Sequence, residues 1–211
     1  QNIYLILINK YNLMNFFTKA KNLVNLKSLN LKMSKIPKFY KFSVDQILNN
    51  KDLIINFILQ NLSKKISIRS SFSLEDGKKN SMAGEFEGLS NTTNSKKNLI
   101  IGIKKLLNQY KKKTRIKKIF LNSEILFQNH LTNSVLSGVV TNYSINDGSD
   151  YYVINYDDTS NLTNTVTSGN KSGGRVLNVF KHRISGLRSQ KFKKIILGVK
   201  EIENKLGKKI K

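Results

Sequence analysis

The pattern of apolar and polar residues predicts four helices. Apolar positions recur at helical spacing at residues 19–29, 45–62, 97–110 and 191–207. Ser43, followed by Asp45 and Gln46, can cap the second of these helices, and the pair Asn49–Asn50 can divide it in two. The closing helix has one apolar and one charged face, which is typical of a helix packed on a core.

Alternating residues predict strands between and after these helices. Residues 65–70, KISIRS, alternate strictly, and a turn with a short strand is expected at residues 36–44. Further strands are predicted at residues 123–131, 137–144, 151–156 and 173–181, with a turn at INDGSD joining the middle pair. Residues 72–96, rich in Gly, Ser, Asn and charge, are expected to form a long loop. Helices come early and strands that look antiparallel come late, so the fold class is α+β.

The charge of the chain raises the question of a polyanionic partner. The net charge is +24, from 37 basic and 13 acidic residues. Lysines are scattered through every segment, which favours a compositional bias with a solvated basic face over a dedicated nucleic-acid surface. The exception is the run YKKKTRIKK at residues 110–118. A basic protein that holds nucleic acid or another polyanion through this run is therefore the alternative hypothesis.

Composition also limits the chemistry and the compartment. Cysteine is absent, which excludes disulfides and thiolate sites. No stretch of about 18 uninterrupted apolar residues is present, so no membrane span is expected. The apolar opening of the chain lacks the pattern of a signal peptide, and we expect a cytoplasmic protein.

The segment around Arg69 is the strongest candidate for a site. Phosphate-binding glycine motifs and metal-binding His or Cys motifs are not found, and His130 and His182 suit ordinary core or surface positions. Arg69 ends the predicted strand, and its planar, permanently charged fork suits phosphate oxygens. Ser70 and Ser71 can add hydroxyl donors, and the small-residue loop NSMAGEFEG can add backbone N–H groups. An ion pair between Arg69 and Glu75 or Asp76 is the other reading, and the residues alone leave both open.

Residues 68–91, IRSSFSLEDGKKNSMAGEFEGLSN, resemble the signature of the nucleotide-binding domain of pyruvate phosphate dikinases and phosphoenolpyruvate synthases. Other matches follow in the family's order: KAKNL at residues 19–23, FQNHL at 127–131, SGVVTN at 137–142 and IENKLG at 202–207. The resemblance is collinear over about residues 18–207 and looks closest to short, capsule-locus-type versions of this domain.

The resemblance implies an ATP-grasp-like fold of two α+β lobes that hold ATP between them. It divides the chain into an N-terminal extension at residues 1–17, a first lobe at 18–122 and a second lobe at 123–211. Lys19 and Arg69 would contact the phosphates, and Gln128 would line the adenine. The remaining ATP-binding positions that the resemblance implies are Ser70, Ser71, Ala83, Gly84, Asn129, His130 and Leu131.

By this resemblance the activity is that of a kinase of the dikinase type, in which MgATP transfers a phosphoryl group to a histidine carrier and then to pyruvate. The phosphohistidine and pyruvate-binding domains would act in cis or in trans. The family's Mg²⁺-binding acid lies in a strand beyond the point where this sequence stops, so the metal ligands stay unknown. Asp157 and Asp158 can approach Mg²⁺, although an exposed strand-end turn is the simpler expectation. An ATP-binding pseudoenzyme is a further alternative.

Overall fold

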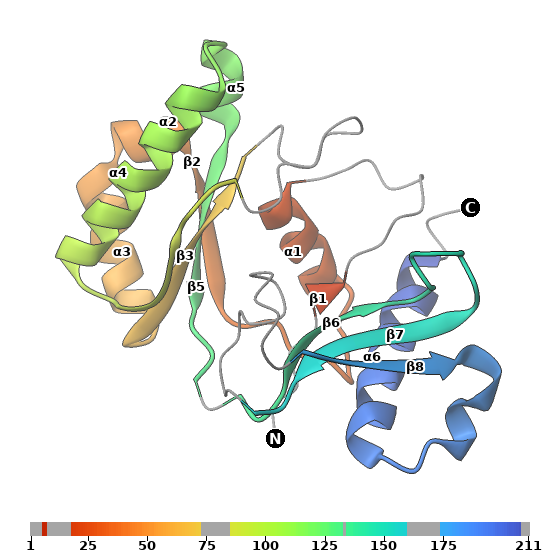
Figure 1. The fold of residues 1–211 in the computed structure, drawn as a ribbon. Coiled ribbons are helices and arrows are strands. Elements are labelled where there is room, and N and C mark those ends of the chain that lie inside the picture. The colour runs from red at the N-terminus through yellow and green to blue at the C-terminus, as the bar shows by residue number, and fades with distance from the viewer. Residues whose placement is uncertain (1–5, 8–17, 73–84, 133, 160–173, 208–211) are drawn as a thin grey trace. The chain divides into compact units, whose positions relative to one another are not determined.

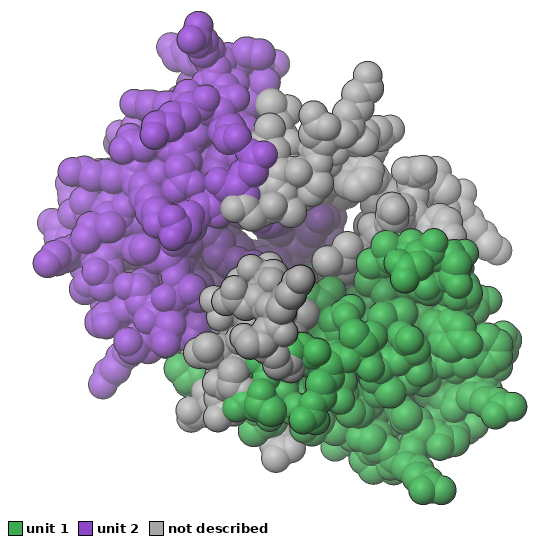
Figure 2. Space-filling view, viewed as in Figure 1, with its two compact units in different colours: residues 1–14, 26–36, 132–211 green, residues 15–25, 37–131 purple. Residues whose placement is uncertain are grey.

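The computed structural model describes residues 6–7, 18–72, 85–132, 134–159 and 174–207, and these form two compact units (Figure 2). Unit 1 comprises residues 1–14, 26–36 and 132–211, and unit 2 comprises residues 15–25 and 37–131. Each unit contains both helices and a four-stranded sheet. The predicted mixture of helix and sheet is therefore confirmed.

Unit 2 contains a sheet with the strand order β2-β5-β3-β4, all neighbours antiparallel (Figure 1). Its strands are β2 (Phe39–Ser43), β3 (Lys65–Ser71), β4 (Leu89–Thr93) and β5 (Glu124–Asn129). Its helices are α2 (Val44–Asn49), α3 (Lys51–Asn61), α4 (Lys96–Lys113) and α5 (Lys117–Asn122), together with the start of α1 (Lys19–Ser28).

The boundary between α2 and α3 follows from local sequence chemistry. Ser43 caps α2 with its hydroxyl, and the Gln46 side chain accepts a hydrogen bond from the Ser43 backbone N–H, which completes a capping box. Asn50 separates the two helices, as the paired asparagines predicted. The break lets each helix present its own apolar residues to the sheet.

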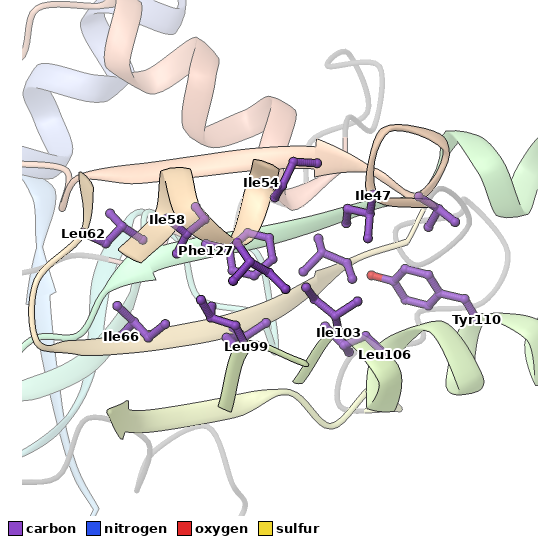
Figure 3. Packing of buried hydrophobic residues seen from close by; sticks show 14 of the residues in the cluster. Ile47, Ile54, Ile58, Leu62, Ile66, Leu99, Ile103, Leu106, Tyr110 and Phe127 are labelled. Carbon is purple, nitrogen blue, oxygen red and sulfur yellow. The ribbon is translucent and has the colours of Figure 1, made fainter. Parts of the chain in front are cut away.

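The core of unit 2 lies between one face of this sheet and the helices α2, α3 and α4 (Figure 3). Gly102 brings α4 close to β3, because a Cβ there would lie 2.6 Å from Cδ1 of Ile68. The cluster is almost entirely aliphatic and aromatic, and its innermost members are Ile47, Ile55, Ile58, Ile66, Ile68, Leu99, Ile103, Leu106, Ile125 and Phe127. Burial of this apolar face fixes the strand register, because a one-residue slip would turn it to the other side.

Unit 1 contains the second sheet, with the strand order β1-β6-β7-β8. Its strands are β1 (Ile6–Leu7), β6 (Ser137–Thr141), β7 (Tyr151–Asp157) and β8 (Arg175–Phe180), followed by the 3₁₀ helix η1 (Lys181–Gly186) and α6 (Gln190–Gly207). The three longer strands are antiparallel, as predicted, whereas β1 pairs parallel to β6. Ile195, Ile196 and Val199 of α6 pack on Val140, Tyr152 and Ile154 of the sheet.

Three elements differ from the sequence-based expectation. The predicted loop at residues 72–96 contains the strand β4, which pairs with β3 at the edge of the sheet. The helix predicted at residues 97–110 continues to Lys113, and the unpredicted helix α5 follows it, so the basic run at residues 110–118 spans the end of α4 and the start of α5. Strand β5, expected to open a second lobe at residue 123, pairs with β2 and β3 and belongs to unit 2. Within the described residues, no helix is both long enough and apolar enough to cross a bilayer.

Candidate functional site

The sheet of unit 2 has a second face that carries polar and charged residues. Successive side chains of a strand point to opposite faces, and directly opposed residues of antiparallel strands share a face. Since Ile66 and Ile68 face the core, Ser67, Arg69 and Ser71 face the other way. The register adds residues of β2 and β5 to this face. We call it the polar face and define it by Lys41, Ser67, Arg69, Ser71, Glu124, Gln128 and His130.

Arg69 occupies the middle of the polar face and is exposed. It is opposite Leu126 of β5, and Lys41 of β2 is opposite the same leucine on the other side. One strand therefore separates the two cations. Lys41 forms an ion pair with Glu124, the carboxylate of this face. Glu124 thus offsets one of the two positive charges.

The first turn of α1 is anchored at the end of the polar face where Ser71 and Glu124 lie opposite each other. The backbone N–H of Ala20 donates to Ser71 Oγ over 3.0 Å, and Thr18 Oγ1 donates to Glu124 Oε2 over 3.0 Å. Ala20 is fully buried at this contact. Lys19 lies between these two anchored residues. It is thereby placed at the end of β3, the strand that carries Arg69.

A serine and a histidine meet at the opposite end of the polar face. Ser67 Oγ lies 2.9 Å from Nδ1 of His130, and the His130 backbone N–H donates to the Lys65 carbonyl over 2.9 Å. Burial, and then the nearby charge of Lys65, hold the pKa of His130 below its usual value. At neutral pH the ring is therefore uncharged, and its Nδ1 shares a hydrogen bond with the Ser67 hydroxyl whose direction is set by which ring nitrogen carries the proton.

The other residues predicted for the site do not lie on the polar face or are outside the described residues. Alternation places Ser70 and Asn129 on the core side of the sheet, where Asn129 Oδ1 accepts a hydrogen bond from the Ser63 backbone N–H. Leu131 follows the end of β5 and is partly buried. Ala83 and Gly84 lie outside the described residues, as do Glu75 and Asp76, the alternative partners of Arg69. Lys19, Arg69, Ser71, Gln128 and His130 are the predicted residues that gather on or beside the polar face.

Sequence reasoning missed Thr18, Lys41, Ser67 and Glu124. Their positions depend on pairings between β2, β3 and β5, which are distant in the chain. A usable signal was the alternation in FYKFS, which puts Lys41 on the side opposite the apolar Tyr40 and Phe42. No comparable local signal predicts that Glu124 will meet both Lys41 and Thr18.

The acidic pair at the end of β7 corrects one expectation. Asp157 is only 3% exposed, and its Oδ1 accepts hydrogen bonds from the backbone N–H and the hydroxyl of Thr159. Asp158 forms an ion pair with Arg175 at 3.3 Å. This strand end is therefore built into the structure rather than freely exposed. Across the described ranges, no group of three or more acidic or histidine side chains is arranged to hold a metal ion.

The fold and its polar face define a protein of mixed helix and sheet in which an exposed arginine stands among hydrogen-bonding side chains. Comparisons with protein-family models, with curated proteins and with solved structures found no match to this chain. The residues of the polar face and the sequence motifs that contain them are therefore the features of this chain that bear on its function.

Proposed function

We propose that this chain is an ATP-binding region of the ATP-grasp type, related to the nucleotide domain of phosphoenolpyruvate synthases and pyruvate phosphate dikinases. In this proposal Arg69 and Lys19 contact the phosphates of ATP, and the end of β5 at Gln128 lies along the base. The observation that carries the proposal is the register of β3 against β5, which puts Arg69 and Gln128 on the same face of one sheet.

The chemistry of this face supports a polyphosphate ligand. Arg69 is exposed on a strand whose backbone is fixed by neighbours on both sides, so its guanidinium is presented from a rigid base. A planar guanidinium can form two parallel hydrogen bonds to phosphate oxygens. The anchored first turn of α1 places Lys19 beside Ser71, two residues along β3 from Arg69, and two cations spread over a polyphosphate stabilise its charge.

Magnesium would be held mainly by the nucleotide. Glu124, the carboxylate of the polar face, already accepts from Lys41 and Thr18, which leaves it poorly placed to serve as a metal ligand. Mg²⁺ commonly combines few protein ligands with phosphate oxygens and water. The complete reaction, phosphoryl transfer to a histidine carrier and then to pyruvate, would need domains in addition to the residues described.

Thermal denaturation with and without MgATP tests the proposal. A ligand present at about 100 times its Kd stabilises the native state by about 2.7 kcal/mol, which gives a shift of several degrees in Tm. We expect this shift for the wild-type chain and a Kd raised by about 10- to 100-fold in Arg69→Ala, because a charge-assisted contact to phosphate is lost. Arg69→Lys should recover part of the affinity.

Arg115→Ala is the matched control, since it removes an exposed arginine from the same unit and leaves the polar face intact. It should bind MgATP like the wild type. AMP, which lacks the terminal phosphates, should discriminate much less between wild type and Arg69→Ala. If MgATP gives no shift, or if Arg69→Ala and Arg115→Ala respond equally, the proposed site is wrong. Binding without phosphoryl exchange, even with the partner domains supplied, would identify a pseudoenzyme.

A further inference from the structure

In unit 2 the helix α5 follows the end of α4 (Figure 1). The sequence places a dense group of cations at this junction. We call this group the basic corner and define it by Lys111, Lys112, Lys113, Arg115, Lys117 and Lys118. All of these side chains are exposed. They all lie within residues 111–118, so their charges act on a common region of solvent. The group shares no residue with the polar face, whose residues come from β2, β3, β5 and the position that follows β5.

Helix stability explains only part of this arrangement. Lys111, Lys112 and Lys113 occupy the last turn of α4, where cations interact favourably with the helix dipole. Lys117 and Lys118 occupy the first turn of α5, where the positive end of the dipole of α5 disfavours cations and an acidic residue would be preferred. Within the described part of the chain, Lys113 pairs with Glu85, and Lys111 lies 5.8 Å from the centre of the Phe120 ring. The basic corner therefore concentrates positive charge at the expense of the stability of α5.

The apolar residues beside the basic corner limit the classes of molecule that it can bind. Ile119, Phe120 and Leu121 of α5 are partly buried against the core cluster of unit 2, which leaves little of their apolar surface to enter a bilayer. Phe120 is also a poor platform for stacking an unpaired base, because its ring packs against the core and has Lys111 beside it. Ile116 is exposed, but a single isoleucine is a small apolar anchor. The remaining contacts are those of flexible, exposed cations, which suit the regularly spaced phosphates of a duplex backbone.

From these observations we propose that the basic corner binds the phosphate backbone of double-stranded nucleic acid without reading its sequence. The interaction is electrostatic and releases counterions, so the affinity falls as the salt concentration rises. With three to five phosphates contacted, the slope of log K against log salt concentration should lie at about −3 to −5, since each contact to B-DNA contributes about −0.9.

Fluorescence anisotropy with labelled 20-base-pair duplexes of DNA and of RNA tests the proposal over a range of KCl concentrations. The corner variant carries Lys112→Gln, Arg115→Gln and Lys118→Gln, which are exposed positions. The control variant carries Arg188→Gln, Lys194→Gln and Lys200→Gln, three exposed positions of unit 1. Both variants lose the same net charge, so only the location of the lost charge differs. Circular dichroism and thermal melting establish that each variant is folded.

We expect the corner variant to lose at least about tenfold in affinity at low salt and to have a slope about 2 to 3 smaller in magnitude, as the loss of three phosphate contacts requires. The control variant should change its affinity by less than about threefold. Equal losses in the two variants would mean diffuse attraction by net charge and would overturn the proposal. So would binding to vesicles of anionic phospholipid in the absence of binding to either duplex. The DNA and RNA arms establish which duplex is preferred.

Discussion

At the scale of single residues, the polar face depends on hydrogen bonds that fix its side chains. His130 illustrates this, because its ring bonds to Ser67 and its backbone bonds to Lys65 on the neighbouring strand. The lowered pKa of His130 means that the folded chain favours the neutral ring. The neutral ring shares its hydrogen bond with Ser67 without adding charge, whereas a protonated ring would place a partly buried positive charge beside Lys65.

We predict that this pair makes stability fall with acidification. Because the pKa of His130 is lower in the folded state than its ordinary value of 6.5, the unfolded chain binds more protons as the pH falls below that value. The contribution of the neutral ring is therefore fully present above about pH 6.5 and is lost progressively as the pH falls toward the folded-state pKa. Urea denaturation at pH 7.5 and at pH 5 should show wild type losing more free energy of unfolding than His130→Gln, which does not titrate.

His182→Gln, which removes the other histidine of the chain from an exposed position, assigns the effect to one ring or the other. A pH dependence that persists unchanged in His130→Gln would contradict the assignment, because the titrating group would then lie elsewhere.

At the scale of secondary-structure elements, Tyr110 ties α4 to the sheet of unit 2. Its hydroxyl accepts a hydrogen bond from the Ser71 backbone N–H over 3.0 Å and donates to the Glu124 carbonyl over 2.7 Å. Its ring, labelled in Figure 3, is fully buried. The ring packs against Phe72 and Phe86. One side chain therefore joins the ends of β3 and β5 at the place where Ser71 also receives the first turn of α1.

Tyr110→Phe should destabilise unit 2 without changing its apolar packing. The substitution leaves the buried Ser71 N–H and the partly buried Glu124 carbonyl without this partner, and an unsatisfied buried group costs about 1–3 kcal/mol. Tyr40→Phe is the matched control, because Tyr40 packs its ring against Phe57 in the same unit. Chemical denaturation should separate the two variants by about 1 kcal/mol or more, the lower end of that range. Equal stabilities would mean that the Tyr110 hydroxyl contributes nothing to the fold.

The sequence predicted those elements whose physical cause is local. The alternation in KISIRS predicts the strand β3, and the capping chemistry of Ser43 predicts the start of α2. The apolar face of the last helix predicts α6. Strand β4, with the sequence LSNTT, lies at a sheet edge, and its residues are exposed or only partly buried, so it lacks an alternating pattern. The two-residue strand β1 is too short to give a pattern.

The candidate site divides in the same way. Arg69 could be chosen because its own segment combines an arginine, two serines and a small-residue loop. Glu124 could not, because its role depends on Lys41 and Thr18, which are 83 and 106 positions away in the chain. Ser70 was chosen as a neighbour of Arg69, but strand alternation turns it toward the opposite face. Adjacent residues in a strand cannot both serve a site on one face.

At the scale of the whole molecule, the dominant property is the excess of positive charge. With 37 basic and 13 acidic residues, 24 positive charges would remain even if every acid formed an ion pair. The described pairs include exposed ones, such as Lys96 with Asp52 at 3.7 Å, which contribute little in water. Repulsion among the remaining cations therefore opposes the compact state, and dissolved ions weaken that repulsion.

We predict that moderate salt stabilises the chain. Raising KCl from about 10 to 150 mM shortens the Debye length from about 30 to 8 Å, which screens most pairs of cations on a molecule of this size. Thermal melting should show Tm rising by several degrees over this range, whereas sorbitol at matched osmolality should not reproduce the rise. A Tm that stays constant or falls would mean that specific ion pairs outweigh the general repulsion.

The two triple variants of the nucleic-acid experiment make this prediction sharper. Repulsion depends mainly on net charge, so the corner variant and the control variant should both show a smaller rise in Tm with salt, by similar amounts. Nucleic-acid affinity depends instead on where the charges lie, so there the two variants should differ. If the salt dependence of stability changed in the corner variant alone, the basic corner would be the main source of repulsion in the molecule. Stability and binding would then share one cause, and the cost of concentrating charge at α5 would be measured directly.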